Sequence, residues 1–270
     1  MVADLSPPAR RGEAMGVWGA AGSVALAAGP LCSIWIVDGW GFTALFRICT
    51  AIGLAALLVT VMQRETRTHS VVTPFTVSSL LSRAAIFPCV VTFCLMTTYG
   101  AQVAFLAIYA QSRGQNAGIF FLVMALVIAL ARGYAGVISD RVGRAPVAAA
   151  GLVATAGALV VLAAGHGVAA FGVAGALYGL GLGSSQPALT AWAVDLVGLE
   201  ERGKAMGTYY AAYELGIASG AVGFGAVLAA TSYPFMFLAA AGMALVAAVF
   251  AASRGRRWTD VHPHTGEEKP

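Results

Sequence analysis

The stretch that decides the fold is Arg132–Arg144, with the sequence RGYAGVISDRVGR. It places four charged side chains, those of Arg132, Asp140, Arg141 and Arg144, between two segments that are almost wholly apolar. Glycine lets backbones approach closely, and charged side chains gather at lipid headgroups. The pattern therefore predicts a tight turn at a membrane surface, joining two membrane-spanning helices.

The composition of the whole chain agrees with this interpretation. The chain is 59% hydrophobic and only 10% charged, with a mean hydropathy of +0.80, whereas soluble domains are about 45–50% apolar and about 25% charged. The net charge of +4 does not indicate nucleic-acid binding, because the basic residues fall in short loops between apolar segments, as topology signals do. The composition predicts a multi-spanning protein of the lipid bilayer, with no nucleic-acid partner.

Membrane-spanning helices of about 20 mostly apolar residues account for most of the chain. Eight segments qualify, so we expect an all-α membrane protein, a bundle of about eight transmembrane helices. The segments are 14–37, 42–62, 84–110, 116–138, 146–164, 168–194, 205–229 and 233–252.

The distribution of Lys and Arg predicts the orientation in the membrane. When successive connections are assigned to alternate sides, every loop Lys and Arg except Arg113 falls on one side. That side is then cytoplasmic, as are both termini. Arg47 and Arg132 lie within apolar segments instead. We expect the protein in a bacterial-type inner membrane.

A spaced set of residues in the charged turn carries a family resemblance. Gly136, Asp140, Arg141, Gly143 and Arg144 follow the pattern G-x-x-x-D-R-x-G-R. This resembles the loop motif of the major facilitator superfamily, which joins helices two and three in that family and recurs between helices eight and nine. The resemblance implies a secondary transporter of a small molecule that rocks two helical bundles. It also implies that the charged residues bridge neighbouring helices at the cytoplasmic face, with the glycines giving close approach. A simple positively charged anchor stays open as an alternative.

A short internal repeat relates the start of the chain to a later part. Residues 11–16, RGEAMG, recur as residues 202–207, RGKAMG, with five identities in six at an offset of 191. Transporters are often built from parallel six-helix halves. We therefore expect the first two apolar segments to correspond to the last two.

Together, the repeat and the resemblance predict a partial fold of this family. Residues 1–62 would supply two helices of the first half, and residues 63–83 the central cytoplasmic linker. A complete second half would follow at 84–253, with a disordered cytoplasmic tail at 254–270. Because the first copy of the motif would fall before Met1, about four N-terminal helices are expected to be missing. A genuine eight-helix protein stays open.

Glu214 is the strongest candidate for coupling transport to protons. It lies about ten residues, roughly 15 Å, beyond Lys204, close to the midplane of a roughly 30 Å hydrocarbon core. A carboxylate is costly at this depth, which favours a proton relay or a partner for a cation. Arg132, roughly 12 Å inside the boundary, is the candidate partner. Structural roles stay open for both side chains.

Other polar residues in the apolar segments are candidates for the substrate cavity. Tyr210 and Tyr213 flank this carboxylate at helical spacing and give its face hydroxyl groups. Tyr99, Gln102 and Gln186 fall on segments that resemble helices seven and ten of the family, which line its central cavity. The two amides would hydrogen-bond substrate or, equally well, a neighbouring helix.

A stripe of small residues predicts close contact between helices. Gly175, Gly179 and Gly183 recur every four residues and therefore share one helix face. Pro187 follows one turn later and predicts a kink.

The direction of transport is the least constrained expectation. Gly29-Pro30 resembles part of a proton-antiporter motif and favours proton-coupled export of a drug-like or metabolite substrate. A proton symporter that imports a metabolite and a non-transporting membrane scaffold stay open.

No nucleophile triad, phosphate-binding loop, carboxylate pair or metal-ligand spacing is seen, so we expect no enzyme activity, cofactor or metal site.

Overall fold

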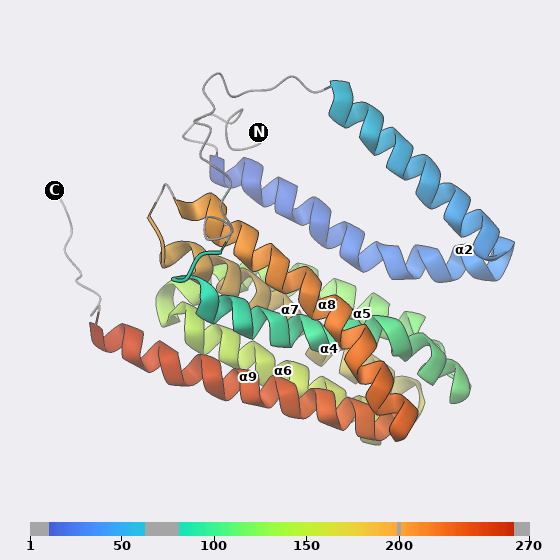
Figure 1. Ribbon diagram of the computed structural model, residues 1–270. Coiled ribbons are helices and arrows are strands. Elements are labelled where there is room, and N and C mark those ends of the chain that lie inside the picture. The colour runs from blue at the N-terminus through green and yellow to red at the C-terminus, as the bar shows by residue number, and fades with distance from the viewer. Residues whose placement is uncertain (1–10, 63–80, 199–200, 262–270) are drawn as a thin grey trace. The chain divides into compact units, whose positions relative to one another are not determined.

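The computed structural model describes residues 11–62, 81–198 and 201–261, and every regular element in these ranges is an α-helix (Figure 1). Most of the predicted linker at 63–83 and the end of the predicted tail, 262–270, lie outside the described residues. The chain divides into two compact units, Met1–Phe75 and Thr76–Pro270. The all-α architecture expected from the sequence is confirmed.

The first unit contains one long helical element, α2, from Arg11 to Met62, which bends sharply at Gly41 (Figure 1). Gly41 has φ 78° and ψ 174°, a backbone conformation that is essentially limited to glycine. The two apolar segments predicted at 14–37 and 42–62 are the arms on either side of this bend. A single glycine thus separates two expected helices within one element.

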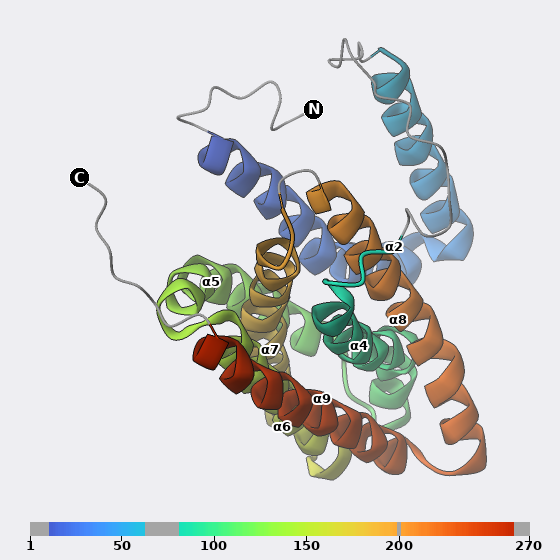
Figure 2. The same cartoon turned by 60° about the vertical axis from the view of Figure 1, so that its left-hand side comes forward.

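In the described residues of the second unit, six helices form a bundle (Figures 1 and 2). They are α4 (Ile86–Ser112), α5 (Gly118–Val142), α6 (Arg144–Ala164), α7 (Gly167–Asp195), α8 (Arg202–Ala230) and α9 (Tyr233–Val261). In the part of the chain that the structure describes, seven helices are long and apolar enough to cross a membrane, the span in α2 being Cys32–Met62. Two helices run further than expected: α5 continues from 138 to Val142, and α9 from 252 to Val261.

Glycines mark the contact between α5 and α7. A methyl group at Gly179 would lie 2.6 Å from the carbonyl oxygen of Met124, and one at Gly183 would lie 2.9 Å from Cβ of Ala131. Side chains larger than hydrogen would force these two backbones apart. The close contact predicted from the glycine stripe of α7 is confirmed.

A second glycine contact joins α4 to α8. A methyl group at Gly216 of α8 would lie 2.7 Å from the carbonyl oxygen of Phe93 in α4. Gly220 of α8 and Gly100 of α4 face the backbone of the opposite helix in the same way. Around these pairs, α7 also packs on α6, and α9 packs on α6 and α4.

The internal repeat has a structural counterpart within each unit. Arg11 begins α2 and Arg202 begins α8, so both copies of the repeated sequence open a helix. The offset of 191 carries Gly41, where α2 bends, onto Ser232, in the break between α8 and α9. The correspondence expected between the first two segments and the last two therefore extends to the position where each pair is interrupted.

Replacing Gly216 by valine is expected to destabilise the second unit. The added side chain clashes with the α4 backbone, and moving that helix away would disrupt its packing against α8. Overpacking of this kind costs about 1–3 kcal/mol, so the thermal transition in detergent should fall by several degrees. Gly223→Val, on the same helix, is the matched control, since a methyl group there meets no heavy atom within 4 Å. An equal loss in both variants would mean that the α4–α8 contact is not what Gly216 provides.

Candidate functional site

In the structure, the turn predicted between the two spans consists of a single non-helical residue. The helix α5 includes Asp140 and Arg141 and ends at Val142, and α6 begins at Arg144, so that Gly143 alone separates them. Gly143 has φ 104° and ψ 153°, outside the range that other residues adopt readily. Position 143 therefore requires glycine for its backbone conformation, whereas the sequence suggested that this glycine lets neighbouring helices approach closely. The motif is the junction of two helices.

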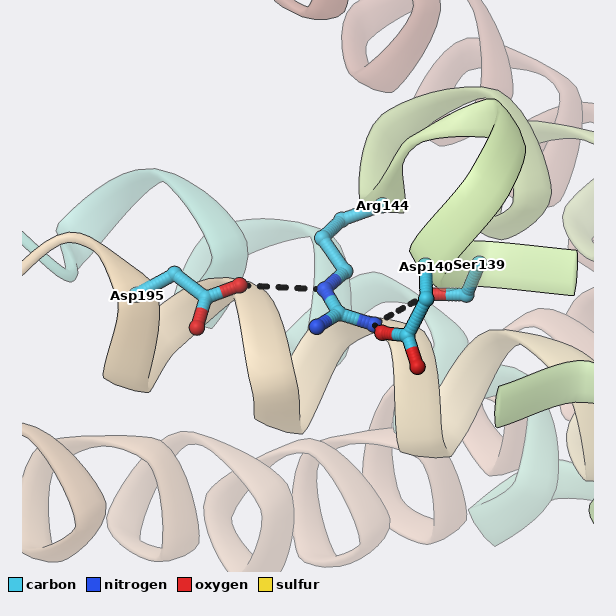
Figure 3. A network of polar contacts seen from close by, with 4 residues as sticks. All are labelled: Ser139, Asp140, Arg144 and Asp195. Carbon is cyan, nitrogen blue, oxygen red and sulfur yellow. Dashed lines mark hydrogen bonds and ion pairs between the residues drawn. The ribbon is translucent and has the colours of Figure 1, made fainter. Parts of the chain in front are cut away.

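Arg144 is the centre of a polar network at this junction (Figure 3). Its Nη1 contacts a carboxylate oxygen of Asp140 at 2.5 Å and donates a hydrogen bond to Oγ of Ser139 at 2.8 Å. Its Nε donates to Oδ2 of Asp195 at 3.0 Å. We call these four residues the arginine clasp. The clasp joins the end of α5, the start of α6 and the end of α7.

The other residues of the motif take no part in the clasp. Arg141 is exposed, and an added methyl group at Gly136 would meet no heavy atom within 4 Å. The bridge between helices expected for Asp140 and Arg144 is found, but the close approach expected at Gly136 is absent among the described residues. That glycine is not needed for packing within the second unit.

Two members of the clasp were not among the residues predicted from the sequence. Ser139 is buried one residue before Asp140, within the stretch Arg132–Arg144. Asp195 follows the apolar segment 168–194, which ends on the same side as the motif. The signal that could have found Asp195 is its position: an acid at the end of a spanning segment, on the side that carries the motif arginines.

A second polar cluster lies within the bundle, at the contact of α5, α7 and α8. The Nη2 of Arg132 donates a hydrogen bond to Oε1 of Gln186. The backbone carbonyl of Gln186 accepts a hydrogen bond from the hydroxyl of Tyr209 at 3.4 Å. The side chain of Tyr213 lies near those of Arg132 and Gln186. Gln186 therefore connects the three helices.

Glu214 lies on α8 beside this cluster. Its side chain is exposed, and Tyr213, the next residue toward the start of the helix, is within electrostatic range of it. Tyr210, one turn earlier, is 46% exposed, and its ring centre lies 6.3 Å from that of Tyr213. Arg132 donates a hydrogen bond to Gln186, and the pairing of Arg132 with Glu214 suggested by the sequence stays a prediction.

The two cavity candidates on α4 are placed differently. Tyr99 is buried, and its side chain lies near Tyr213. Gln102 is fully buried, and its Nε2 lies 3.7 Å from Sδ of Met124 in α5. Gln102 therefore faces the α4–α5 contact and does not join the cluster. We call Arg132, Gln186, Tyr210, Tyr213 and Glu214 the midplane cluster.

The comparison with known families decides the identity of the fold. Residues 1–132 and residues 89–269 each match the family described as Major Facilitator Superfamily. The chain belongs to the major facilitator superfamily. The resemblance drawn from the Gly136–Arg144 motif is thereby confirmed. No curated protein matches the chain.

Membership of the major facilitator superfamily establishes the general activity. The protein is a multi-spanning membrane transporter, and its substrate is a small molecule. In this transporter, Asp140 and Arg144 of the family motif form the arginine clasp together with Ser139 and Asp195.

A double-mutant cycle between Arg144 and Asp195 is expected to show coupling. Partly exposed ion pairs contribute about 0.2–1 kcal/mol, so Arg144→Ala and Asp195→Asn should each lower unfolding stability slightly. The double variant should lose less than the sum of the single variants, because both remove the same contact. The measurement is unfolding of the detergent-solubilised protein. Arg141→Ala combined with Asp195→Asn is the control and should be additive; coupling there, or none with Arg144, would contradict the clasp.

Proposed function

We propose that this transporter is proton-coupled, that Glu214 carries the proton, and that Arg132 responds to its charge. The observation that carries the proposal is the exposed carboxylate of Glu214 on α8, next to Tyr213, which lies near Gln186 and Arg132. Gln186 in turn accepts hydrogen bonds from Tyr209 of α8 and from Arg132 of α5. Glu214 is the thirteenth residue of α8, about 18 Å from its start at 1.5 Å per residue. An ionisable group at this depth is a functional candidate in a membrane protein.

The composition of the midplane cluster supports a drug-like or metabolite substrate. Tyr210 and Tyr213 present aromatic faces, while Gln186 and Arg132 supply hydrogen-bonding groups. Sites for small amphipathic molecules combine apolar walls with a few polar groups in this way. The proposed direction is export, for which Gly29-Pro30 within α2 is the supporting feature. Import by proton symport would use the same carboxylate.

The distribution of charge supports an inner-membrane orientation with cytoplasmic termini. We call the end of the second unit that holds the clasp the clasp end; α4, α6 and α8 begin there, and α5, α7 and α9 end there. Of the described Lys and Arg side chains of this unit, all but Arg113 and Arg132 lie at the clasp end; Arg113 lies at the opposite end and Arg132 within the bundle. Positively charged loops face the cytoplasm in membrane proteins. We therefore place the clasp end on the cytoplasmic side.

Replacing Glu214 by glutamine is expected to remove the dependence of transport on a proton gradient. The amide cannot take up or release a proton, so ethidium uptake by inside-out vesicles should no longer respond to an imposed pH gradient. Exchange of ethidium without a gradient should continue, because the cluster keeps its shape. Glu201→Gln, an exposed carboxylate just before α8, is the matched control. Gradient-driven uptake that survives in Glu214→Gln would contradict the assignment.

Removing the hydroxyl of Tyr213 is expected to weaken the link between Glu214 and Arg132. One hydrogen bond contributes about 0.5–1.5 kcal/mol, which corresponds to a loss of about two- to tenfold in gradient-driven uptake for Tyr213→Phe. Tyr210→Phe is the control, because it keeps the same aromatic wall and alters a hydroxyl one turn away. Equal losses in the two variants would indicate a general effect on the cavity wall.

A further inference from the structure

Away from the midplane cluster, the clasp end carries an arginine stacked on aromatic rings. The guanidinium carbon of Arg254, in α9, lies 5.3 Å from the ring centre of Phe87 in α4. Phe87 also stacks on Phe250 of α9, with ring centres 4.4 Å apart, and lies 5.3 Å from Trp192 of α7. Stacking over a ring stabilises a cation by about 0.5–1 kcal/mol at exposed sites. The Arg254 side chain is therefore held above the contact of α4 and α9.

An apolar surface leads along the membrane span to this arginine. Val246, Phe250 and Arg254 are four residues apart and share one face of α9. Val246 is 70% exposed and Phe250 is 41% exposed. On the neighbouring helix α4, Ile86 and Val90 are also exposed. Two apolar helix faces that end at a cation match a phospholipid, with its acyl chains along the helices and its phosphate at the guanidinium.

Charge at the clasp end favours an anionic lipid. The described side chains there include six basic and three acidic residues, a net charge of +3. They are Arg83, Arg141, Arg144, Arg202, Lys204 and Arg254, with Asp140, Asp195 and Glu201. Asp140 and Asp195 are both engaged by Arg144. At the opposite end, Arg113 is the only Lys, Arg, Asp or Glu among the described residues.

We propose that Arg254, Phe87 and the exposed faces of α4 and α9 bind one anionic phospholipid, with its phosphate at Arg254. Arg83 supplies a second cation: it is exposed and lies at the same end of α4, where its carbonyl accepts a hydrogen bond from the N–H of Ile86 at 3.4 Å. Clusters of basic residues at the end of a membrane span bind anionic headgroups, with about 1 kcal/mol from each cation. The apolar faces favour a lipid over free phosphate, because free phosphate has no acyl chains to pack against them.

The test is native mass spectrometry of the full chain in detergent, with phosphatidylglycerol or phosphatidylcholine of the same acyl chains added. The wild-type protein should prefer phosphatidylglycerol. Arg254→Ala should weaken phosphatidylglycerol binding by about fivefold, as the loss of one cation predicts, and leave phosphatidylcholine binding unchanged. Arg254→Gln, which keeps most of the side-chain length, should show the same loss and serves if the alanine variant does not fold.

Arg113→Ala is the matched control, because Arg113 also stacks on a ring, 5.0 Å from the centre of Tyr109, at the opposite end. It should leave phosphatidylglycerol binding unchanged. The proposal is overturned if Arg113→Ala and Arg254→Ala lose binding equally, if both Arg254 variants bind as the wild type does, or if the wild type shows no headgroup preference. Displacement of the lipid by an equal concentration of inorganic phosphate would assign the site to free anions and overturn the lipid proposal.

Discussion

Backbone contact at glycines holds the second unit together, because lipid tails are as apolar as the side chains and provide little drive for helices to associate. Gly216 sets α8 directly against α4, and Gly183 sets α7 against α5. Both contacts position the midplane cluster. Glu214 stands two residues, about 200° of helix rotation, from Gly216 and so faces away from α4. Gln186 follows Gly183 by one turn and reaches Arg132.

Polar contacts add to this packing where the helices leave the hydrocarbon. At the clasp end, Gly143 turns the chain within one residue. Arg144, at the start of α6, then contacts α5 through Asp140 and Ser139 and α7 through Asp195. The three charged side chains of the clasp are partly exposed, so they contribute little to the free energy of unfolding and act mainly by setting how α5, α6 and α7 meet. The same charged end carries Arg254, for which we propose an anionic phospholipid as ligand.

Much of this architecture could be predicted, because hydrophobic span length and glycine spacing are local properties of the chain. The helices, the bend region near Gly41 and the glycine stripe of α7 follow from them. The rotation of each helix is not local. Gln102 and Gln186 look alike in the sequence, yet one turns to Met124 and the other to Arg132. Asp195 is 51 residues from Arg144; its position at the end of a spanning segment marks it as a candidate, but the pairing itself depends on how α7 packs beside α6.

The most direct test asks whether the Glu214 face of α8 lines a water-filled path. With Cys32, Cys49, Cys89 and Cys94 replaced by serine, single cysteines along α8 are exposed to a charged, membrane-impermeant thiol reagent. Exposed positions 210, 214 and 218 should react, whereas buried positions 209 and 224 should not. If 210, 214 and 218 stay unlabelled in membranes, this face of α8 lies in lipid and the midplane cluster is not the transport site.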